Sequence, residues 1–287
     1  MIIRDKVHIT PFVIMSLLVA VFFSGSFSDN LAYAKVDEKQ VNAIEQLLND
    51  LISTVENRSN IIAQLQADVI ELKIKTTEPY KYNPGQYVSL WKDENLGRSY
   101  SLASLPENGG DLIFHIRLIP DGQFSGWVHN DLQVGDTLFV QGPAGDCFYT
   151  SGKPEQNLLL IGTGTGLAPL YGIIHDALQQ GHTGEIHLFH GALNPSGLYL
   201  TEELTNLAQQ HSNVKYHPCV MTAEENMSSN ITEGDINDIA LEIVPKPSGW
   251  KSFLCGDEDL VNKLRKQIFL AGSSMNDIYS DPFIPSK

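Results

Sequence analysis

The chain has 287 residues, a hydrophobic content of 42% and a formal net charge of −15 at neutral pH. This length allows one large domain or two ordinary ones with a substantial core. The acidic balance argues against nucleic acid as a partner, because binding it requires a basic face. The three cysteines, Cys147, Cys219 and Cys255, have no metal-site spacing and are fewer than the four that an iron–sulfur cluster normally takes.

The N-terminus predicts a signal peptide or a membrane anchor over residues 1–34. Arg4 and Lys6 precede an apolar stretch that ends near Phe23, and Ala32-Tyr33-Ala34 follows. This order is typical of a secretory signal, and the apolar stretch, if extended to Phe27, is just long enough to span a bilayer. An extension that is neither is the alternative. We expect membrane association through this segment and otherwise a cytoplasmic location.

A helical linker and then a series of short strands are predicted next. Residues 35–53 carry apolar side chains at helical spacing. Beyond them the pattern alternates, which is typical of half-buried strands. The alternating runs are Val69–Ile74, Tyr87–Trp91, Leu112–Leu118 and Thr137–Gln141. Such short, closely spaced strands predict an antiparallel β-barrel or sandwich, which we place at residues 54–150.

From Asn157 onward, strands alternate with helices. The predicted strands are Leu158–Ile161, Ile186–His190 and Val214–Val220, and the helices between them are Leu170–Gln180 and Thr201–Gln210. This order predicts an α/β domain with a parallel sheet, which we place at residues 155–287.

A glycine-rich turn joins the first of these strands to its helix. It consists of Gly162, Thr163, Gly164, Thr165 and Gly166. Glycines let the backbone approach a ligand closely, and the start of a helix offers free N–H groups to a pyrophosphate. A glycine turn with no ligand is the alternative, because such a motif is weak by itself.

A second motif, Arg98-Ser99-Tyr100-Ser101, lies in the β half. Arg98 and Tyr100 share one face of a strand, and the Ser101 hydroxyl is beside them. Together they could hold a phosphate, stack on a flat ring and bond to its edge. An ordinary half-exposed strand is the alternative.

Five motifs stand in one order along the chain and carry a resemblance to a known family. They are Pro84-Gly85-Gln86-Tyr87, Arg98-x-Tyr100-Ser101-x-x-Ser104, Gly142-Pro143-x-Gly145, Gly162–Pro169 and Cys255-Gly256. The ordered set resembles the ferredoxin–NADP reductase superfamily, especially its bacterial oxygenase-reductase and flavin-reductase branch. The resemblance covers roughly residues 54–283.

The resemblance implies that the β-barrel binds FAD. By similarity, Arg98 holds the FAD pyrophosphate with Ser99 beside it, Tyr100 stacks on the flavin ring and Ser101 bonds to its reactive edge. His115, Ile116 and Arg117 would pass along the flavin on the next strand. Backbone N–H groups of the turn Gly122-Gln123-Phe124-Ser125 would contact the pyrophosphate.

The resemblance also implies a site for a nicotinamide cofactor in the α/β domain. Gly162–Gly166 would hold its pyrophosphate, and Cys255 and Gly256 would lie near the nicotinamide. Phe283, in an acidic-x-Phe motif with Asp281, would lie close to the flavin. The composition is equally consistent with Cys255 as a small buried apolar residue. For Phe283, the alternative is that it belongs to a frayed tail.

The implied reaction is the transfer of electrons from NAD(P)H through FAD to a separate acceptor. Many relatives carry a 2Fe–2S domain, for which this chain lacks the cysteines, and its acidity disfavours an acidic ferredoxin as the acceptor. A reductase of free flavin is one alternative. A catalytically silent, membrane-tethered scaffold is the other.

We expect NADH to be preferred to NADPH. In a doubly wound sheet the adenosine ribose meets the loop after the second strand, here Gly191–Tyr199. This loop has no Arg or Lys to bind a 2′-phosphate, although it also lacks the acidic residue that commonly binds the NAD ribose. A distant cation, such as Lys215 or Lys251, is the alternative source of charge.

Overall fold

The structure, a computed structural model, describes residues 68–106, 111–225 and 227–283, all within one compact unit. The predicted signal or anchor at 1–34 and linker at 35–53 lie outside the described residues. No helix in the described ranges is both long and apolar enough to cross a membrane.

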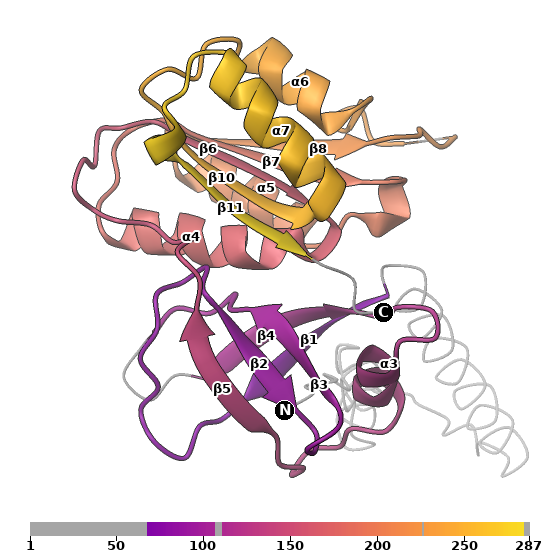
Figure 1. The fold of residues 1–287 in the computed structure, drawn as a ribbon. Coiled ribbons are helices and arrows are strands. Elements are labelled where there is room, and N and C mark those ends of the chain that lie inside the picture. The colour runs from indigo at the N-terminus through magenta and orange to yellow at the C-terminus, as the bar shows by residue number, and fades with distance from the viewer. Residues whose placement is uncertain (1–67, 107–110, 226, 284–287) are drawn as a thin grey trace, which may run out of the picture. The chain divides into compact units, whose positions relative to one another are not determined.

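Antiparallel strands form the first half of the described chain (Figure 1). Strand β1 pairs with β4 in one sheet, and β2 pairs with both β3 and β5 in another. The two sheets meet where the Ala103 N–H donates to the Ile113 carbonyl at 2.9 Å. The elements are β1 Val69–Ile74, β2 Tyr87–Trp91, β3 Gly97–Ser101, β4 Leu112–Arg117, α3 Gln123–Asn130 and β5 Phe139–Ala144.

Three of the four predicted strands of this half are confirmed closely, and β5 is shifted by two to three residues. Alternation explains the agreement, since one face of each strand packs inward: Leu72, Leu90 and Phe114 are fully buried in a shared core. The predicted antiparallel architecture is confirmed, because the described strands of this half form two antiparallel sheets.

The second half is a parallel sheet with the strand order β11-β10-β6-β7-β8-β9. Strand β6 therefore lies between β7, the next strand in the chain, and β10, which comes much later. The strands are β6 Leu158–Thr163, β7 Ile186–Ala192, β8 Val214–Val220, β9 Thr232–Glu233, β10 Lys251–Asp257 and β11 Ile278–Phe283.

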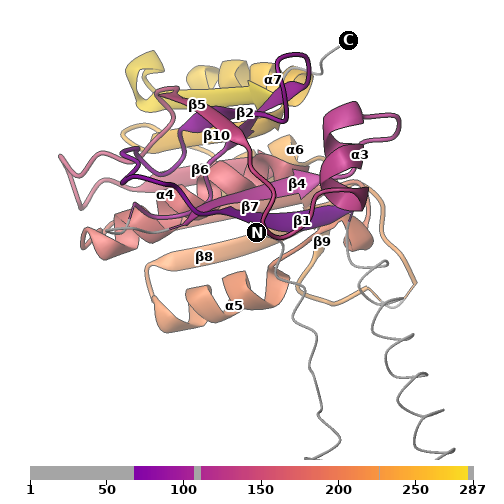
Figure 2. The same cartoon turned by 90° about the horizontal axis from the view of Figure 1, so that it is seen from below.

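Helices cover both faces of this sheet. In Figure 1, α6 and α7 lie above the sheet and α4 lies below it, and Figure 2 shows α5 along β8 on the side away from α7. The helices are α4 Leu167–Gln179, α5 Thr201–Gln210, α6 Ile236–Ile243 and α7 Glu258–Leu270, with short 3₁₀ turns η1 Gly164–Gly166, η2 Pro195–Gly197 and η3 Met275–Asp277. The predicted α/β domain is confirmed.

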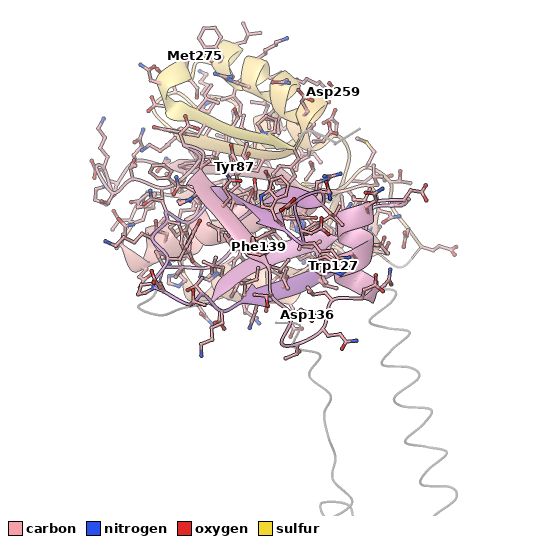
Figure 3. The ribbon with its side chains drawn as sticks, turned by 60° about the horizontal axis from the view of Figure 1, so that its bottom comes forward. Tyr87, Trp127, Asp136, Phe139, Asp259 and Met275 are labelled. Atoms are coloured by element: carbon pink, nitrogen blue, oxygen red, sulfur yellow. The ribbon has the colours of Figure 1, made fainter. Side chains whose placement is uncertain are left out.

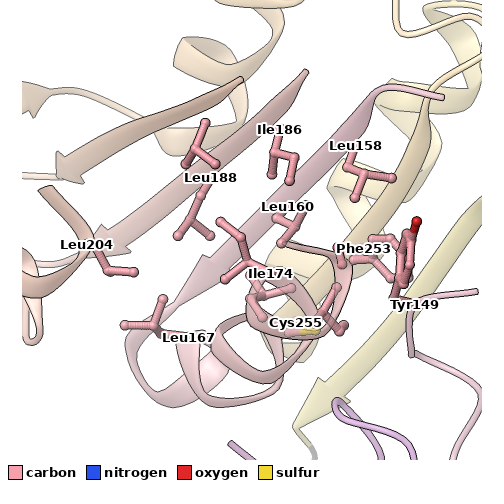
Figure 4. Close-up of a cluster of buried hydrophobic side chains, with 14 of the residues drawn as sticks. Tyr149, Leu158, Leu160, Leu167, Ile174, Ile186, Leu188, Leu204, Phe253 and Cys255 are labelled. Carbon is pink, nitrogen blue, oxygen red and sulfur yellow. The ribbon is translucent and has the colours of Figure 1, made fainter. Parts of the chain in front are cut away.

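The core under α4 and α5 shows why β6 is apolar throughout. Leu158 and Leu160 point into the α4 side together with Ile174 and Phe253 (Figure 4). Leu159 and Ile161 point to the other side, toward α6 and α7. A parallel strand that is buried on both faces needs a continuous apolar run, and Leu158–Ile161 supplies it.

The glycine turn after β6 packs directly against the end of β10. A Cβ atom on Gly166 would overlap the backbone carbonyl of Cys255, and one on Gly162 would come within 2.7 Å of Leu170. Gly164 has a φ of +54°, a left-handed conformation that favours glycine. Each glycine of the turn is therefore required by the fold.

Gly166→Ala should lower the free energy of unfolding by about 1–3 kcal/mol or more, because the added methyl group meets fixed backbone and not a movable side chain. Urea unfolding measures this change. Gly152→Ala is the matched control, since a Cβ atom there meets nothing within 4 Å. Equal stability of the two variants would contradict the packing described here.

Candidate functional site

The order of the strands places a ligand site at the carboxyl edge of the parallel sheet. The chain leaves β6 toward β7 on one side, whereas β10 pairs with β6 on the other. Such a reversal of strand order opens a crevice at the carboxyl ends of the two central strands, where α/β proteins bind ligands. The glycine turn Gly162–Gly166 and the Cys255-Gly256 pair both lie at this point.

Ser101 links the antiparallel half of the chain to the sheet at the same place. Its buried hydroxyl donates to Asp281 Oδ2 at 2.8 Å, and Asp281 is paired in register with Cys255. Burial raises the pKa of Asp281, while the Ser101 hydrogen bond opposes that rise. Asp281 thus connects two predicted residues that are widely separated in the sequence, since it accepts from Ser101 and lies beside Cys255. Phe283 ends the same strand, beside Asp257.

Cys255 is fully buried and lies against a second cysteine. Its Sγ atom is 3.7 Å from Sγ of Cys147, and both are free thiols. Burial raises the pKa of Cys255 well above its ordinary value, with Cys147 adding to the effect. Cys255 therefore stays a neutral thiol in the core. The sequence did not predict this proximity, because 108 residues separate the two cysteines.

The Arg98–Ser101 strand lies beside the start of α3. The Tyr100 ring is 5.6 Å from that of Phe124, and burial raises the pKa of Tyr100 to about 12. Arg98 Nη1 donates to the neighbouring Gly97 carbonyl at 2.6 Å. The first N–H groups of a helix have no partner within the helix, so this corner combines a guanidinium, a ring and free backbone donors.

The Gly122–Ser125 turn is held by its own side chain. Ser125 Oγ accepts from the Ile119 N–H at 3.1 Å and donates to the Gly122 carbonyl at 3.4 Å. Phe124 is buried and Gln123 is exposed. Ser125 therefore shapes the turn, and what the turn can offer a ligand is its backbone. Ser99 is exposed, and its Oγ lies 3.1 Å from Ser89 Oγ.

The three predicted residues of β4 divide between the two faces of that strand. The Ile116 side chain is fully buried in the core of the antiparallel half, so only the backbone of this residue could contact a ligand. His115 and Arg117 point the other way, because side chains alternate along a strand. His115 Nδ1 lies 3.1 Å from the Tyr199 hydroxyl.

Arg117 reaches the glycine turn. A Cβ atom on Gly164 would come within 3.2–3.3 Å of the Arg117 guanidinium, and Arg117 Nη2 is 3.5 Å from the Gly197 carbonyl. The resemblance placed this residue along the flavin. In the structure its guanidinium lies at the carboxyl edge of the parallel sheet, although the residue comes from the other half of the chain. Because side chains alternate along a strand, the sequence could have predicted that His115 and Arg117 lie on the same face.

His190 closes the base of this region. It is fully buried, its Nδ1 lies 3.2 Å from the Tyr216 hydroxyl, and its ring meets Tyr199 edge-on at 5.4 Å. Burial is the main reason that its pKa falls to about 3, with the Arg117 charge adding to the effect. Burial likewise lowers the pKa of His115 to about 4. Both histidines are therefore neutral at neutral pH, so they add no positive charge beside Arg117.

A separate pocket of about 630 Å³ lies between α4 and α5. It is lined by His175, by Leu198–Thr201 and by the inner face of α5, including Glu203. Two of its lining residues, Leu198 and Tyr199, belong to the loop at which the adenosine ribose is expected.

Comparison with known proteins finds two family models that match successive parts of the chain. A model described as an oxidoreductase FAD-binding domain matches residues 57–149, and one described as an oxidoreductase NAD-binding domain matches residues 160–266. The ferredoxin–NAD(P)(+) reductase component of the naphthalene 1,2-dioxygenase/salicylate 5-hydroxylase systems of a Ralstonia species is 32% identical over 81% of this chain and 70% of its own.

Two further relatives extend the comparison. The reductase component of phenol 2-monooxygenase from Pseudomonas sp. (strain CF600) is 29% identical over 86% of this chain and 70% of its own. Among solved structures, the Amycolatopsis cytochrome P450 reductase GcoB superposes with a TM-score of 0.71 at 30% identity, covering 76% of this chain and 66% of that one. The chain thus spans about two thirds of the length of these relatives.

The neutral histidines predict that stability falls in acid. Below pH 6.5 the unfolded chain takes up protons at both histidines, whereas the folded chain does not until the pH nears 4 at His115 and 3 at His190. The free energy of unfolding should therefore fall between pH 6.5 and 4.5, by up to about 1.4 kcal/mol per pH unit for each histidine. Urea unfolding at several pH values measures the slope.

The variant His115→Asn/His190→Asn should flatten this slope. His211→Asn, at the end of α5, controls for loss of a histidine elsewhere. An unchanged slope in the double variant would show that other groups control the acid response.

Proposed function

Because the chain belongs to the ferredoxin–NADP reductase family of FAD- and NAD(P)-binding oxidoreductases, we propose that it passes electrons from a nicotinamide cofactor through bound FAD to a separate acceptor. The observation that carries the proposal is the meeting of Ser101 and Arg117 with the glycine turn and Cys255 at one edge of the parallel sheet. The relatives named above are reductase components of larger systems, which supports a separate acceptor.

The antiparallel half would hold FAD. Arg98 would pair with its pyrophosphate, together with the backbone N–H groups at the start of α3, which includes Gln123. Tyr100, half-buried against Phe124, would offer its ring to the flavin. Bound FAD supplies the redox chemistry, because its ring accepts a hydride and gives up electrons.

The parallel half would hold the nicotinamide cofactor. The backbone of Gly162–Gly166 and the guanidinium of Arg117 provide donors and positive charge for a pyrophosphate. Thr163 and Gly256 lie close enough that a Cβ atom on Gly256 would come within 2.6 Å of Thr163 Oγ1. Glycine at position 256 therefore lets the backbone at the end of β10 lie against Thr163.

Ser101 and Asp281 would control the reacting edge. The Ser101 hydroxyl donates to Asp281, so its proton is engaged. A substrate group that approaches Ser101 must share or replace this bond. Phe283, at the end of the strand that carries Asp281, would limit access of water to the same region.

The purified full-length chain should be yellow with bound FAD and should bleach when NADH is added without air. Arg98→Ala should weaken FAD binding by roughly ten- to a hundredfold, because a charge-assisted contact to the pyrophosphate is lost. Visible spectra of the retained flavin measure both effects. Lys92→Ala, which removes a cation over the Trp127 ring in the same half, is the matched control.

The colour of the purified chain and its response to NADH distinguish between the possible functions. A colourless chain that oxidises NADH only when free flavin is supplied would indicate a free-flavin reductase. A colourless chain with no activity under either condition would indicate a silent scaffold.

The electrostatics of the carboxyl edge favour NADH over NADPH. The loops after β7 and β8 are joined by hydrogen bonds from Met221 and Thr222, and the second loop carries exposed Glu224 and Glu225. These carboxylates would repel a 2′-phosphate. The distant cations are badly placed to help. Lys215 and Lys251 stand at the amino ends of β8 and β10, about 17–20 Å from the carboxyl edge.

The value of kcat/KM should be at least about tenfold higher for NADH than for NADPH, since no dedicated cation meets the 2′-phosphate. Thr222→Arg should narrow this ratio by improving the use of NADPH. Ser228→Arg, further along the same loop, controls for added charge alone. If Arg117→Ala reduced the use of NADPH but not of NADH, Arg117 would serve the 2′-phosphate and the preference proposed here would be wrong.

A further inference from the structure

Two histidines face each other on neighbouring strands of the parallel sheet. His187 is on β7 and His217 is on β8, and these strands pair directly. His187 Nδ1 is 3.2 Å from His217 Nε2, whereas the ring centroids are 5.1 Å apart. The nitrogens are therefore on the facing edges of the rings, where one ring can donate a hydrogen bond to the other. This histidine pair has no part in the cofactor sites proposed above.

The histidine pair lies away from the glycine turn, toward the amino ends of the strands. His187 is in register with Leu159, near the start of β6, and the glycine turn follows the end of that strand. Three residues separate Leu159 from Gly162, which is about 10 Å along the strand. Both histidine rings are only partly buried, so an ion in solution can reach them.

Aromatic neighbours hold both rings in place. The fully buried Phe189 ring stacks on His217 with the centroids 4.4 Å apart, and the Trp250 ring meets His187 edge-on at 5.4 Å. Side chains on strands of a packed sheet are also positioned more precisely than side chains on loops. The two nitrogens are therefore close together before any ligand binds.

The surroundings keep both imidazoles neutral at neutral pH. Burial is the main reason that the pKa of each histidine is lowered, to about 4 for His217. The Lys215 charge adds to the effect at both rings, whereas Glu185 opposes it at His187. Neutral imidazole is the form that binds metal ions, because one of its nitrogens then has a free lone pair.

The separation of the two nitrogens fits a shared metal ion. Zinc binds histidine nitrogen at about 2.0–2.1 Å, so two such ligands lie about 2.8–3.4 Å apart for angles of about 90–109° at the metal. The observed 3.2 Å is within this range. Imidazole suits zinc, copper and nickel, whereas magnesium and calcium prefer oxygen ligands.

We propose that His187 and His217 together bind one divalent ion of the zinc, nickel and copper class. Each ring would direct its facing lone pair at the ion and keep its proton on the other nitrogen. Within the described ranges, no group of three or more His, Cys, Asp and Glu side chains is placed to hold a metal. Water would therefore complete the coordination, and an ion held by two protein ligands exchanges readily with the solution.

Calorimetric titration of the untagged full-length chain with ZnCl₂ tests the site. The original protein should bind the ion with a Kd in the micromolar range. In the variant His187→Asn/His217→Asn, the Kd should rise by more than about a hundredfold, since loss of a partner outside the ligand shell already weakens binding by about 10- to 100-fold. His211→Asn, which removes a half-buried histidine at the end of α5, is the matched control and should bind zinc as the original does.

Tryptophan fluorescence gives a second, local measurement. A bound Cu²⁺ ion quenches a nearby indole, and Trp250 is in contact with the histidine pair. Quenching by low concentrations of CuSO₄ should therefore be lost in Trp250→Phe and in the double histidine variant. Trp127→Phe should retain it, because Trp127 is on α3 in the antiparallel half (Figure 3).

MgCl₂ is the control ion and should produce no heat that depends on the histidine pair. Circular dichroism should show that the double variant is folded. If it does not fold, the single variants His187→Gln and His217→Gln carry the same expectation. Equal zinc affinity of the original and of the folded variants would overturn the proposal. An original protein that binds no zinc at millimolar concentration would also overturn it, and the two rings would then form a hydrogen-bonded pair only.

Discussion

The contact between the glycine turn and the end of β10 is the constraint on which the site depends. Gly166 lies so close to the Cys255 carbonyl that no side chain fits between them. This contact exists only because β10 pairs with β6 on the side away from β7. A reversal of strand order thus produces the crevice, and the glycines keep it narrow enough for backbone donors to act directly on a ligand.

Around this crevice, burial determines which side chains carry a charge. His115 and His190 are kept neutral by burial, and Asp281 has a raised pKa because it too is largely removed from water. Arg117 is then the cation nearest to the glycine turn among the residues described. In the proposed site, an anionic cofactor would meet this positive charge and the backbone N–H dipoles of the turn, in a protein whose overall charge is strongly negative.

The overall negative charge of the protein acts on approaching partners, whereas the crevice itself contains a positive charge. A chain with a net charge of −15 repels acidic partners at long range, which supports the proposal of an acceptor with a basic or neutral docking face. In the cofactor preference proposed above, the acidic loop after β8 would act at short range in the same sense, against the extra phosphate of NADPH. Arg117 is sheltered between Gly164 and Gly197, so the crevice stays attractive to a pyrophosphate.

The sequence by itself determined the elements and the family. Alternation defined β1, β2 and β4, since a strand with one buried face must repeat every two residues, and the unbroken run Leu158–Ile161 defined a strand buried on both faces. The ordered motifs identified the two cofactor-binding halves. These features are local, because each depends only on neighbouring residues and the solvent.

Only the tertiary structure decided which distant residues meet. Ser101 bonds Asp281 across 180 residues, Cys147 contacts Cys255 across 108, and Arg117 leaves its own half of the chain to reach Gly164. Ile116, adjacent to Arg117, turns into the core instead. No local pattern encodes these contacts, because they depend on strand order and on which face of each strand the packing leaves open.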